Sequence, residues 1–138
     1  MSKYHNVWIF KAENDLQSAN ILIQQNPPLL DVAVFHTQQC AEKALKGFLS
    51  FRRQEIRKTH NPAELIRKCA ALDSSFETLL ADGDFLTPQA TEFRYPGTDD
   101  DGDEIADFSE FMPAFDDVQE SVSKASAVLE FVKSKTVT

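Results

Sequence analysis

The chain has 138 residues, a mass of 15.5 kDa and a formal net charge of −8, with 14 Lys and Arg against 22 Asp and Glu. This length predicts one domain over residues 1–138 and excludes a dinucleotide-binding fold with a separate substrate domain. The acidic balance argues against a protein that coats nucleic acid or an anionic membrane through its overall field, but it leaves room for a local basic patch.

The first predicted helix covers residues from about 4 to 25, a stretch without Gly or Pro. Its apolar residues recur every three or four positions, as on one face of a helix: Trp8, Ala12, Leu16, Ala19 and Ile23. The polar residues between them are expected to face outward: Lys11, Asn14, Asp15 and Ser18. Proline cannot donate the helical hydrogen bond, so Asn26-Pro27-Pro28 is expected to end this helix.

The second predicted helix runs from Leu30 or Asp31 to about Arg53, with Asp31 as a possible N-cap. Its apolar residues cover more than one face, which is typical of the central helix of a bundle. A polar stripe lies beside them: Gln38, Gln39, Glu42, Lys43 and Lys46. A pair formed by Glu42 and Lys46 would contribute a few tenths of a kcal/mol if exposed. The stripe is typical either of a shared cleft or dimer interface or of an ordinary solvated surface.

Four further helical segments, one of them short, are predicted after the second helix. Asn61 and Pro62 suit the N-cap and first position of a helix over Pro62–Leu72, and Thr87-Pro88 suggests the same start for a helix ending near Arg94 or Tyr95. A turn and a short helix around residues 76–80 are expected between them. The last helix carries a seam spaced by four and three: Phe111, Phe115, Val118, Val122, Ala125, Leu129 and Val132. The pattern predicts an all-α, up-and-down bundle of four to six helices.

No cofactor or metal is predicted. The chain contains no Gly-rich phosphate loop and no HExxH, GxSxG or CxxC motif. The acidic loop of residues 99–104 does not fit an EF-hand, because Gly97 and Phe108 stand where Asp and a bidentate Glu belong. Cys40 and Cys69 are expected to be buried free thiols. Without an apolar leader or a stretch of 18 apolar residues, the sequence is expected to be a soluble cytoplasmic protein.

Charge is distributed unevenly along the chain. Residues 43–60 hold six Lys and Arg against one acid, whereas residues 99–117 hold nine acids and no base. The basic run could hold phosphate or RNA, or it could be a solvated helix end whose cations complement the helix dipole. The candidate residues for nucleotide or phosphate binding are Lys43, Lys46, Arg57, Lys58 and Arg94. Arg94 could instead pair with an acid of the following loop.

The run from Phe35 to Lys46, FHTQQCAEKALK, is followed by Lys58-Thr59-His60-Asn61 and later by Arg94-Tyr95-Pro96. Together with the first helix, this pattern resembles the HEPN domain over essentially the whole chain. The resemblance implies an all-α bundle of about five helices, usually a homodimer. Many such proteins are encoded beside a minimal nucleotidyltransferase as toxin–antitoxin or defence pairs, and many are metal-independent ribonucleases.

The resemblance implies a motif for the ribonucleases of this family, in which an Arg is followed by a His after four to six intervening residues. In that chemistry His moves a proton to or from the RNA and Arg stabilises charge on the phosphate. Arg94 has no His after it, and Arg53 with His60 is the only formal match. His60 could instead order its loop, while His36, Trp8 and Tyr95 are expected in the core and no role is predicted for His5.

The leading hypothesis is therefore an HEPN-type homodimer that binds a nucleotide, RNA or a nucleotidyltransferase partner without a complete ribonuclease motif. Two alternatives stay open. One is an active metal-independent endoribonuclease that uses Arg53 and His60. The other is a pure protein-interaction module whose acidic loop, Asp99 to Glu104, docks on a basic partner.

Overall fold

The structure is a computed structural model, and it describes residues 3–56, 58–93 and 96–137. Five α-helices build it: α1 (His5–Ile23), α2 (Leu30–Phe51), α3 (Pro62–Leu72), α4 (Leu80–Glu92) and α5 (Phe115–Lys135). Two 3₁₀ helices, η1 (Ser74–Leu79) and η2 (Phe108–Phe111), connect them. No strand occurs among the described residues beyond one isolated bridge between Thr98 and Glu104. The predicted all-α bundle is confirmed.

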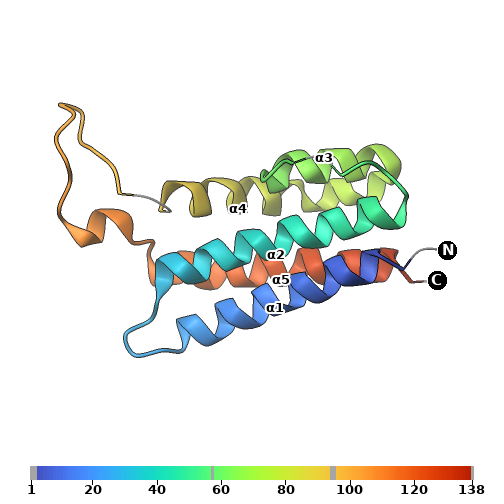
Figure 1. Ribbon diagram of the computed structural model, residues 1–138, viewed down its shortest axis with the longest axis horizontal. Coiled ribbons are helices and arrows are strands. Elements are labelled where there is room, and N and C mark those ends of the chain that lie inside the picture. The colour runs from blue at the N-terminus through green and yellow to red at the C-terminus, as the bar shows by residue number, and fades with distance from the viewer. Residues whose placement is uncertain (1–2, 57, 94–95, 138) are drawn as a thin grey trace.

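Helix α2 is the centre of the bundle (Figure 1). It packs against α1 on one side, α3 and α4 on the other, and α5 behind it. Its thirteen buried residues explain why its apolar positions cover more than one face. Aromatic contacts join its C-terminal half to the rest of the core, since the Phe76 ring lies 4.3 Å from that of Phe48 and 4.9 Å from that of Phe131.

The segment between α2 and α3 runs back along the bundle before α3 begins (Figure 1). Asn61 caps α3 as predicted, with its Oδ1 accepting a hydrogen bond from the Glu64 backbone N–H at 3.2 Å. The bounds of α3 also agree with the prediction. This return path places residues 58–61 beside the middle of α2, although they follow its end in sequence.

The expected helix start at Thr87-Pro88 is wrong, because α4 already begins at Leu80 and Pro88 lies inside it. Leu79, Gly83 and Leu86 keep a buried face at helical spacing through this stretch. The Thr87 hydroxyl donates to the Gly83 carbonyl at 2.7 Å and accepts from the Ala63 N–H of α3 at 3.3 Å. Packing against α3 therefore outweighs the local proline signal.

Three other boundaries also differ from expectation. Helix α2 ends at Phe51 rather than Arg53, and Asp31 lies in its first turn without capping it, because the N-cap residue is Leu29. Phe111 belongs to η2 rather than to the last helix. Pro113 forces the residue before it out of the helical region, and Met112 is extended with φ −114° and ψ 128°.

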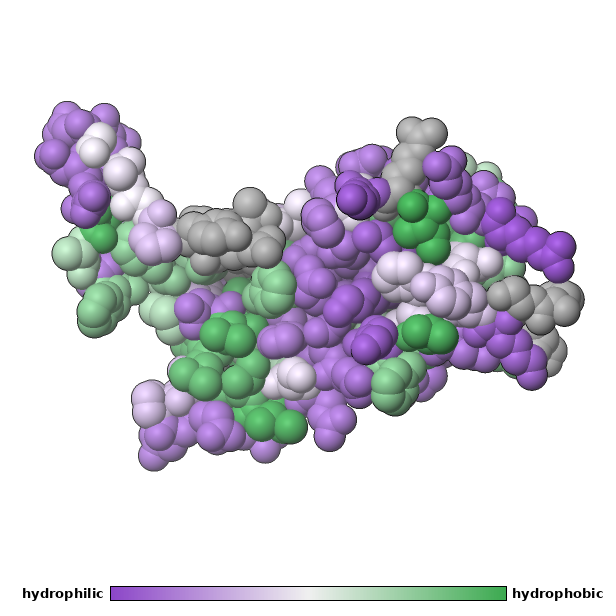
Figure 2. All heavy atoms as spheres, viewed as in Figure 1, coloured by the Kyte–Doolittle hydropathy of each residue, from purple (hydrophilic) through white to green (hydrophobic). Residues whose placement is uncertain are grey.

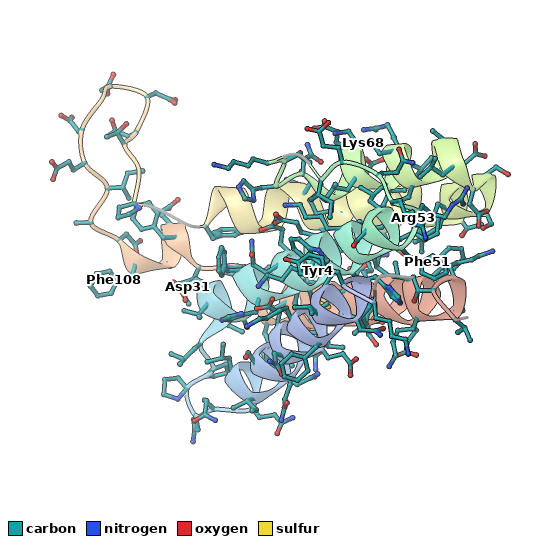
Figure 3. All side chains as sticks on the ribbon, turned by 45° about the vertical axis from the view of Figure 1, so that its right-hand side comes forward. Tyr4, Asp31, Phe51, Arg53, Lys68 and Phe108 are labelled. Atoms are coloured by element: carbon teal, nitrogen blue, oxygen red, sulfur yellow. The ribbon has the colours of Figure 1, made fainter. Side chains whose placement is uncertain are left out.

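An arm formed by residues 96–114 projects from one end of the bundle (Figure 1). Asp99 shapes its tip, since its Oδ1 accepts the backbone N–H groups of Asp101 and Asp103, both at 2.9 Å. Gly102 adopts a φ of +83°, which only glycine takes readily. Beyond the tip, the Phe108 side chain points away from the body and is 85% exposed (Figure 3).

Candidate functional site

One side of α2 faces α1 and the returning residues 58–61 rather than α5 (Figure 1). Hydrophilic side chains gather over it, with apolar side chains on either side (Figure 2). We call it the polar face of α2, and it consists of His36, Gln38, Gln39, Glu42, Lys43 and Lys46. The predicted polar stripe therefore exists, but its residues are largely buried or half-buried rather than solvated.

One edge of the polar face is organised around Glu42, whose side chain is 4% exposed. Its Oε1 accepts from Lys46 Nζ at 2.8 Å and lies 2.7 Å from His60 Nδ1. Its Oε2 accepts from the amides of Gln38 at 3.1 Å and Gln39 at 3.2 Å. The same Gln38 amide also donates to the His60 carbonyl at 2.6 Å, which fixes the returning segment to α2.

The opposite edge is organised around Asp15 of α1, whose side chain is 10% exposed. Its Oδ1 lies 2.8 Å from His36 Nδ1, and its Oδ2 accepts from Lys43 Nζ at 2.7 Å. The expectation that Asp15 faces outward is therefore wrong. Ala12, Asp15 and Ala19 follow the three- and four-residue spacing of one helical stripe, and this spacing could have identified Asp15 as an inward-facing carboxylate.

Both edges thus repeat one arrangement, in which a buried carboxylate holds one lysine and one histidine. A carboxylate can only accept, so Nδ1 of each imidazole carries the hydrogen. The Nε2 atoms of His36 and His60 have no hydrogen-bond partner among the described residues. The His60 side chain is 72% exposed and the His36 side chain 27% exposed, so both rings can meet a ligand.

Two aromatic groups at the start of α1 adjoin this face. Lys46 Nζ lies 5.8 Å from the centre of the Trp8 ring. Within the described part of the chain, Trp8 Nε1 and His5 Nδ1 are buried without a hydrogen-bond partner. Trp8 is half-buried and His5 packs edge-on against Phe51 at 4.9 Å, so both serve the α1–α2 contact.

The structure separates the residues that the sequence grouped as phosphate ligands. Lys43 and Lys46 face carboxylates, whereas Lys58 is exposed on the returning segment. Arg57 and Arg94, together with Tyr95, lie outside the described residues. Glu42 and Lys46 form the ion pair that their four-residue spacing suggested, but the pair is buried, so the estimate for an exposed pair does not apply.

Arg53 and His60 do not meet within one subunit. Arg53 is exposed just beyond the C-terminal end of α2 with a φ of +58° (Figure 3). His60 lies against Glu42, ten residues before Arg52, the C-cap of α2, which corresponds to about 15 Å along a helix axis. Arg53 and His60 therefore lie at different levels along α2.

Cys40 and Cys69 are buried free thiols, as predicted. Burial raises the pKa of each thiol to about 12, with the Asp15 carboxylate adding to the effect at Cys40. Across residues 3–56, 58–93 and 96–137, no group of three or more His, Cys, Asp or Glu is arranged to hold a metal ion. No helix of this part of the chain is long and apolar enough to cross a membrane.

Residues 5–135 match the HEPN domain family. The chain belongs to this family. The crystal structure of ST0689, described as an archaeal HEPN homologue, is similar to it with a TM-score of 0.71 and 31% identity, over 99% of this chain and 100% of that one. The crystal structure of TT1696 from Thermus thermophilus superposes with a TM-score of 0.77 over 97% of this chain and 99% of that one, at 24% identity, and supports the fold.

A curated relative shares a shorter segment with this HEPN protein. The "Putative toxin MJ1304" of Methanocaldococcus jannaschii is 43% identical over 47 residues, which are 34% of this chain. The match spans 30% of that relative's own length.

Proposed function

We propose that this HEPN protein is a homodimer that binds RNA or a nucleotide and acts in a toxin–antitoxin-like pair with a minimal nucleotidyltransferase. The observation that carries the proposal is the polar face of the central helix, where the partly exposed side chains of His36, Lys43 and His60 gather over buried carboxylates. A bundle normally covers its central helix with apolar neighbours, so charged and titratable side chains gathered from α1, α2 and the segment before α3 favour a ligand or partner. Membership of the HEPN family and the toxin-named relative support the biological setting.

Two measurements test this proposal. Light scattering at micromolar concentration is expected to give about 31 kDa, twice the mass of the chain, and a value near 15.5 kDa would contradict the homodimer. Fluorescence anisotropy with a single-stranded RNA and with ATP is expected to detect binding that Lys58→Gln weakens. Lys11→Gln on the exposed surface of α1 is the matched control. Equal losses in the two variants would assign the binding to overall charge instead of the site.

A metal-independent endoribonuclease is a second candidate, favoured by the contact between Glu42 and His60. The carboxylate holds the imidazole with Nε2 open, as a general base requires. The neutral His60 would take the proton of a ribose 2′-hydroxyl, O2′ would attack phosphorus, and the P–O5′ bond would break. The departing O5′ would take a proton from water, leaving a 2′,3′-cyclic phosphate and a 5′-hydroxyl end.

Arg53 of a second subunit would stabilise the charge on the phosphate in this reaction. Purified wild-type protein and the His60→Ala variant are each incubated with a defined RNA, and the amount of product with a 2′,3′-cyclic phosphate end is measured. Cleavage that disappears in His60→Ala would establish the enzyme, and cleavage that both preparations share would point to a contaminating nuclease.

The projecting arm favours a protein-interaction module as a third candidate. Its acidic tip and the exposed Phe108 stand clear of the bundle, where a basic partner could reach them (Figure 3). Pull-down of a minimal nucleotidyltransferase, the partner proposed above, is compared with and without the segment from Asp99 to Glu104. Unchanged capture would exclude the arm as the docking element.

A further inference from the structure

We infer that the polar face of α2 binds the phosphates of single-stranded RNA more tightly when His36 and His60 are protonated, so that these two histidines make the affinity of the site depend on pH. This inference rests on the RNA binding proposed above and adds the groups that hold the phosphates and the condition that controls them.

The first step concerns the charge that the face carries. Asp15 and Glu42 balance Lys43 and Lys46, so the face is neutral when both imidazoles are neutral. Protonation of both adds two positive charges at the surface. Histidine is the side chain that ordinarily changes charge between pH 5 and pH 8, so the sign of this face depends on the two rings.

The second step concerns the availability of the lysines. The Lys43 ammonium lies 2.7 Å from Asp15 and the Lys46 ammonium 2.8 Å from Glu42, with Lys46 only 8% exposed. Lys46 is therefore covered, whereas Lys43, 29% exposed, keeps N–H donors that Asp15 does not occupy, although Asp15 balances its charge. The two Nε2 atoms face no carboxylate, because the contacts to Asp15 and Glu42 use Nδ1. The protonated rings therefore add accessible N–H donors whose charge no further carboxylate balances.

The third step concerns the groups around each ring. His36 contacts the Asp15 carboxylate of α1, which also binds Lys43 of α2. The Phe35 ring lies edge-on to the His36 ring, with 5.7 Å between the ring centres. His60 shares Glu42 Oε1 with Lys46 of α2. On the side of α3, the neighbouring Thr59 hydroxyl donates to Glu64, which also lies 3.6 Å from Lys68.

A proton added to either ring strengthens its contact with a carboxylate that a lysine also uses. It also adds an N–H donor at Nε2 and one positive charge that no further carboxylate balances. The affinity of the face for an anion is therefore expected to rise as the pH falls.

The spacing of the donors indicates a polymer. His36 and Glu42 are six residues apart on α2, about 9 Å along a helix axis, and His60 is held at Glu42. Two anion-binding points at such a separation, on an elongated face, suit a strand with repeated phosphates better than one inorganic phosphate. Because the contacts involve the backbone, little sequence preference is expected.

The test measures the affinity of a 12-nucleotide single-stranded RNA with hydroxyl ends by fluorescence anisotropy at pH 8.0 and pH 5.5. The hydroxyl ends remove terminal phosphates that would titrate in this range. Wild type is expected to bind about tenfold more tightly at pH 5.5. The slope of log affinity against log salt is expected to steepen by about 1.4, since each phosphate contact on a single strand contributes about 0.7.

Paired variants give opposite outcomes. H36Q/H60Q is expected to bind weakly at both pH values, and H36K/H60K to bind tightly at both. Q119K/S123K is the matched control, because it adds two charges at exposed positions of α5 and is expected to keep the pH dependence of wild type. His60 is 72% exposed, so H60Q and H60K alone decide the question if the double variants do not fold.

RNA affinity independent of pH, or a pH effect that survives in H36Q/H60Q, would overturn the inference and leave the proposed RNA binding intact. No RNA binding at either pH would overturn both. Light scattering that shows a change of mass with pH, without an effect on RNA, would assign the face to a second copy of the chain and also overturn the inference.

Discussion

The buried pair of Glu42 and Lys46 provides a sharp test of the energetics of the polar face, because the chain contains an exposed counterpart. Glu64 and Lys68 on α3 have the same order and the same four-residue spacing. The two pairs differ in burial, since the side chains of Glu42 and Lys46 are 4% and 8% exposed and those of Glu64 and Lys68 are 52% and 39% exposed.

Coulomb's law indicates the expected size of the difference. At 2.8 Å and an effective dielectric constant of about 20, the attraction between Glu42 and Lys46 is about 6 kcal/mol. At 3.6 Å in a dielectric constant of about 80, the attraction between Glu64 and Lys68 is about 1 kcal/mol. Desolvation offsets a large part of the first value, so a coupling energy of about 2–3 kcal/mol is expected for the buried pair. The exposed pair is expected to give about 0.3–0.5 kcal/mol.

Two double-mutant cycles measure these energies by urea unfolding at pH 8. One uses Glu42→Gln, Lys46→Met and both together, and the other uses the same changes at Glu64 and Lys68. Glu42→Gln alone is expected to cost about 3–5 kcal/mol, because it leaves the Lys46 ammonium buried without a counter-charge. The double variant is expected to recover much of this loss. Equal coupling energies in the two cycles would refute the burial of this pair and the argument that Lys46 is unavailable to phosphate.

Two further predictions concern the core. Gly83→Ala is expected to destabilise the protein by about 1–3 kcal/mol despite the better helix propensity of alanine, because the added Cβ would lie 2.5 Å from Ile66 Cδ1 and 3.1 Å from Ala63 Cα. Thermal unfolding measures this, and a raised melting temperature would contradict the close packing of α3 and α4. Cys40 and Cys69 are expected to react with Ellman's reagent at pH 8 only as fast as the protein unfolds, since burial raises their pKa to about 12. Rapid labelling of the folded protein would contradict their burial.

Two proline signals show how far local sequence determines the fold. Asn61-Pro62 and Thr87-Pro88 both match an N-cap followed by a first helical residue. Only the first begins a helix, where the Asn61 side chain accepts from the Glu64 N–H. At the second, the buried stripe continues from Leu79 through Leu86, and the helix passes through the proline. The sequence predicts the bundle from its periodicity, but tertiary packing decides which local signal is used.

Only the part of the site that lies on one helix could be predicted from the sequence, because the rest depends on tertiary packing. The polar stripe of α2 could be located from spacing alone, but its partners come from α1 and from a segment about 20 residues further along. The return of residues 58–61 along α2 brings His60 to Glu42, and no local pattern encodes that path. The inward position of Asp15 was visible in its spacing from Ala12 and Ala19, but its charge favoured the outward interpretation.

The run of bases in residues 43–60 illustrates why charge counted along a sequence differs from charge presented at a surface. Lys43 and Lys46 appear as free cations in the sequence, and each is matched by a carboxylate in the fold. Two histidines contact the same carboxylates, so the local charge depends on which groups the fold brings together. Under the pH dependence inferred above, this acidic protein would bind RNA more tightly at lower pH. The local arrangement of these groups would then matter more than the net charge of −8.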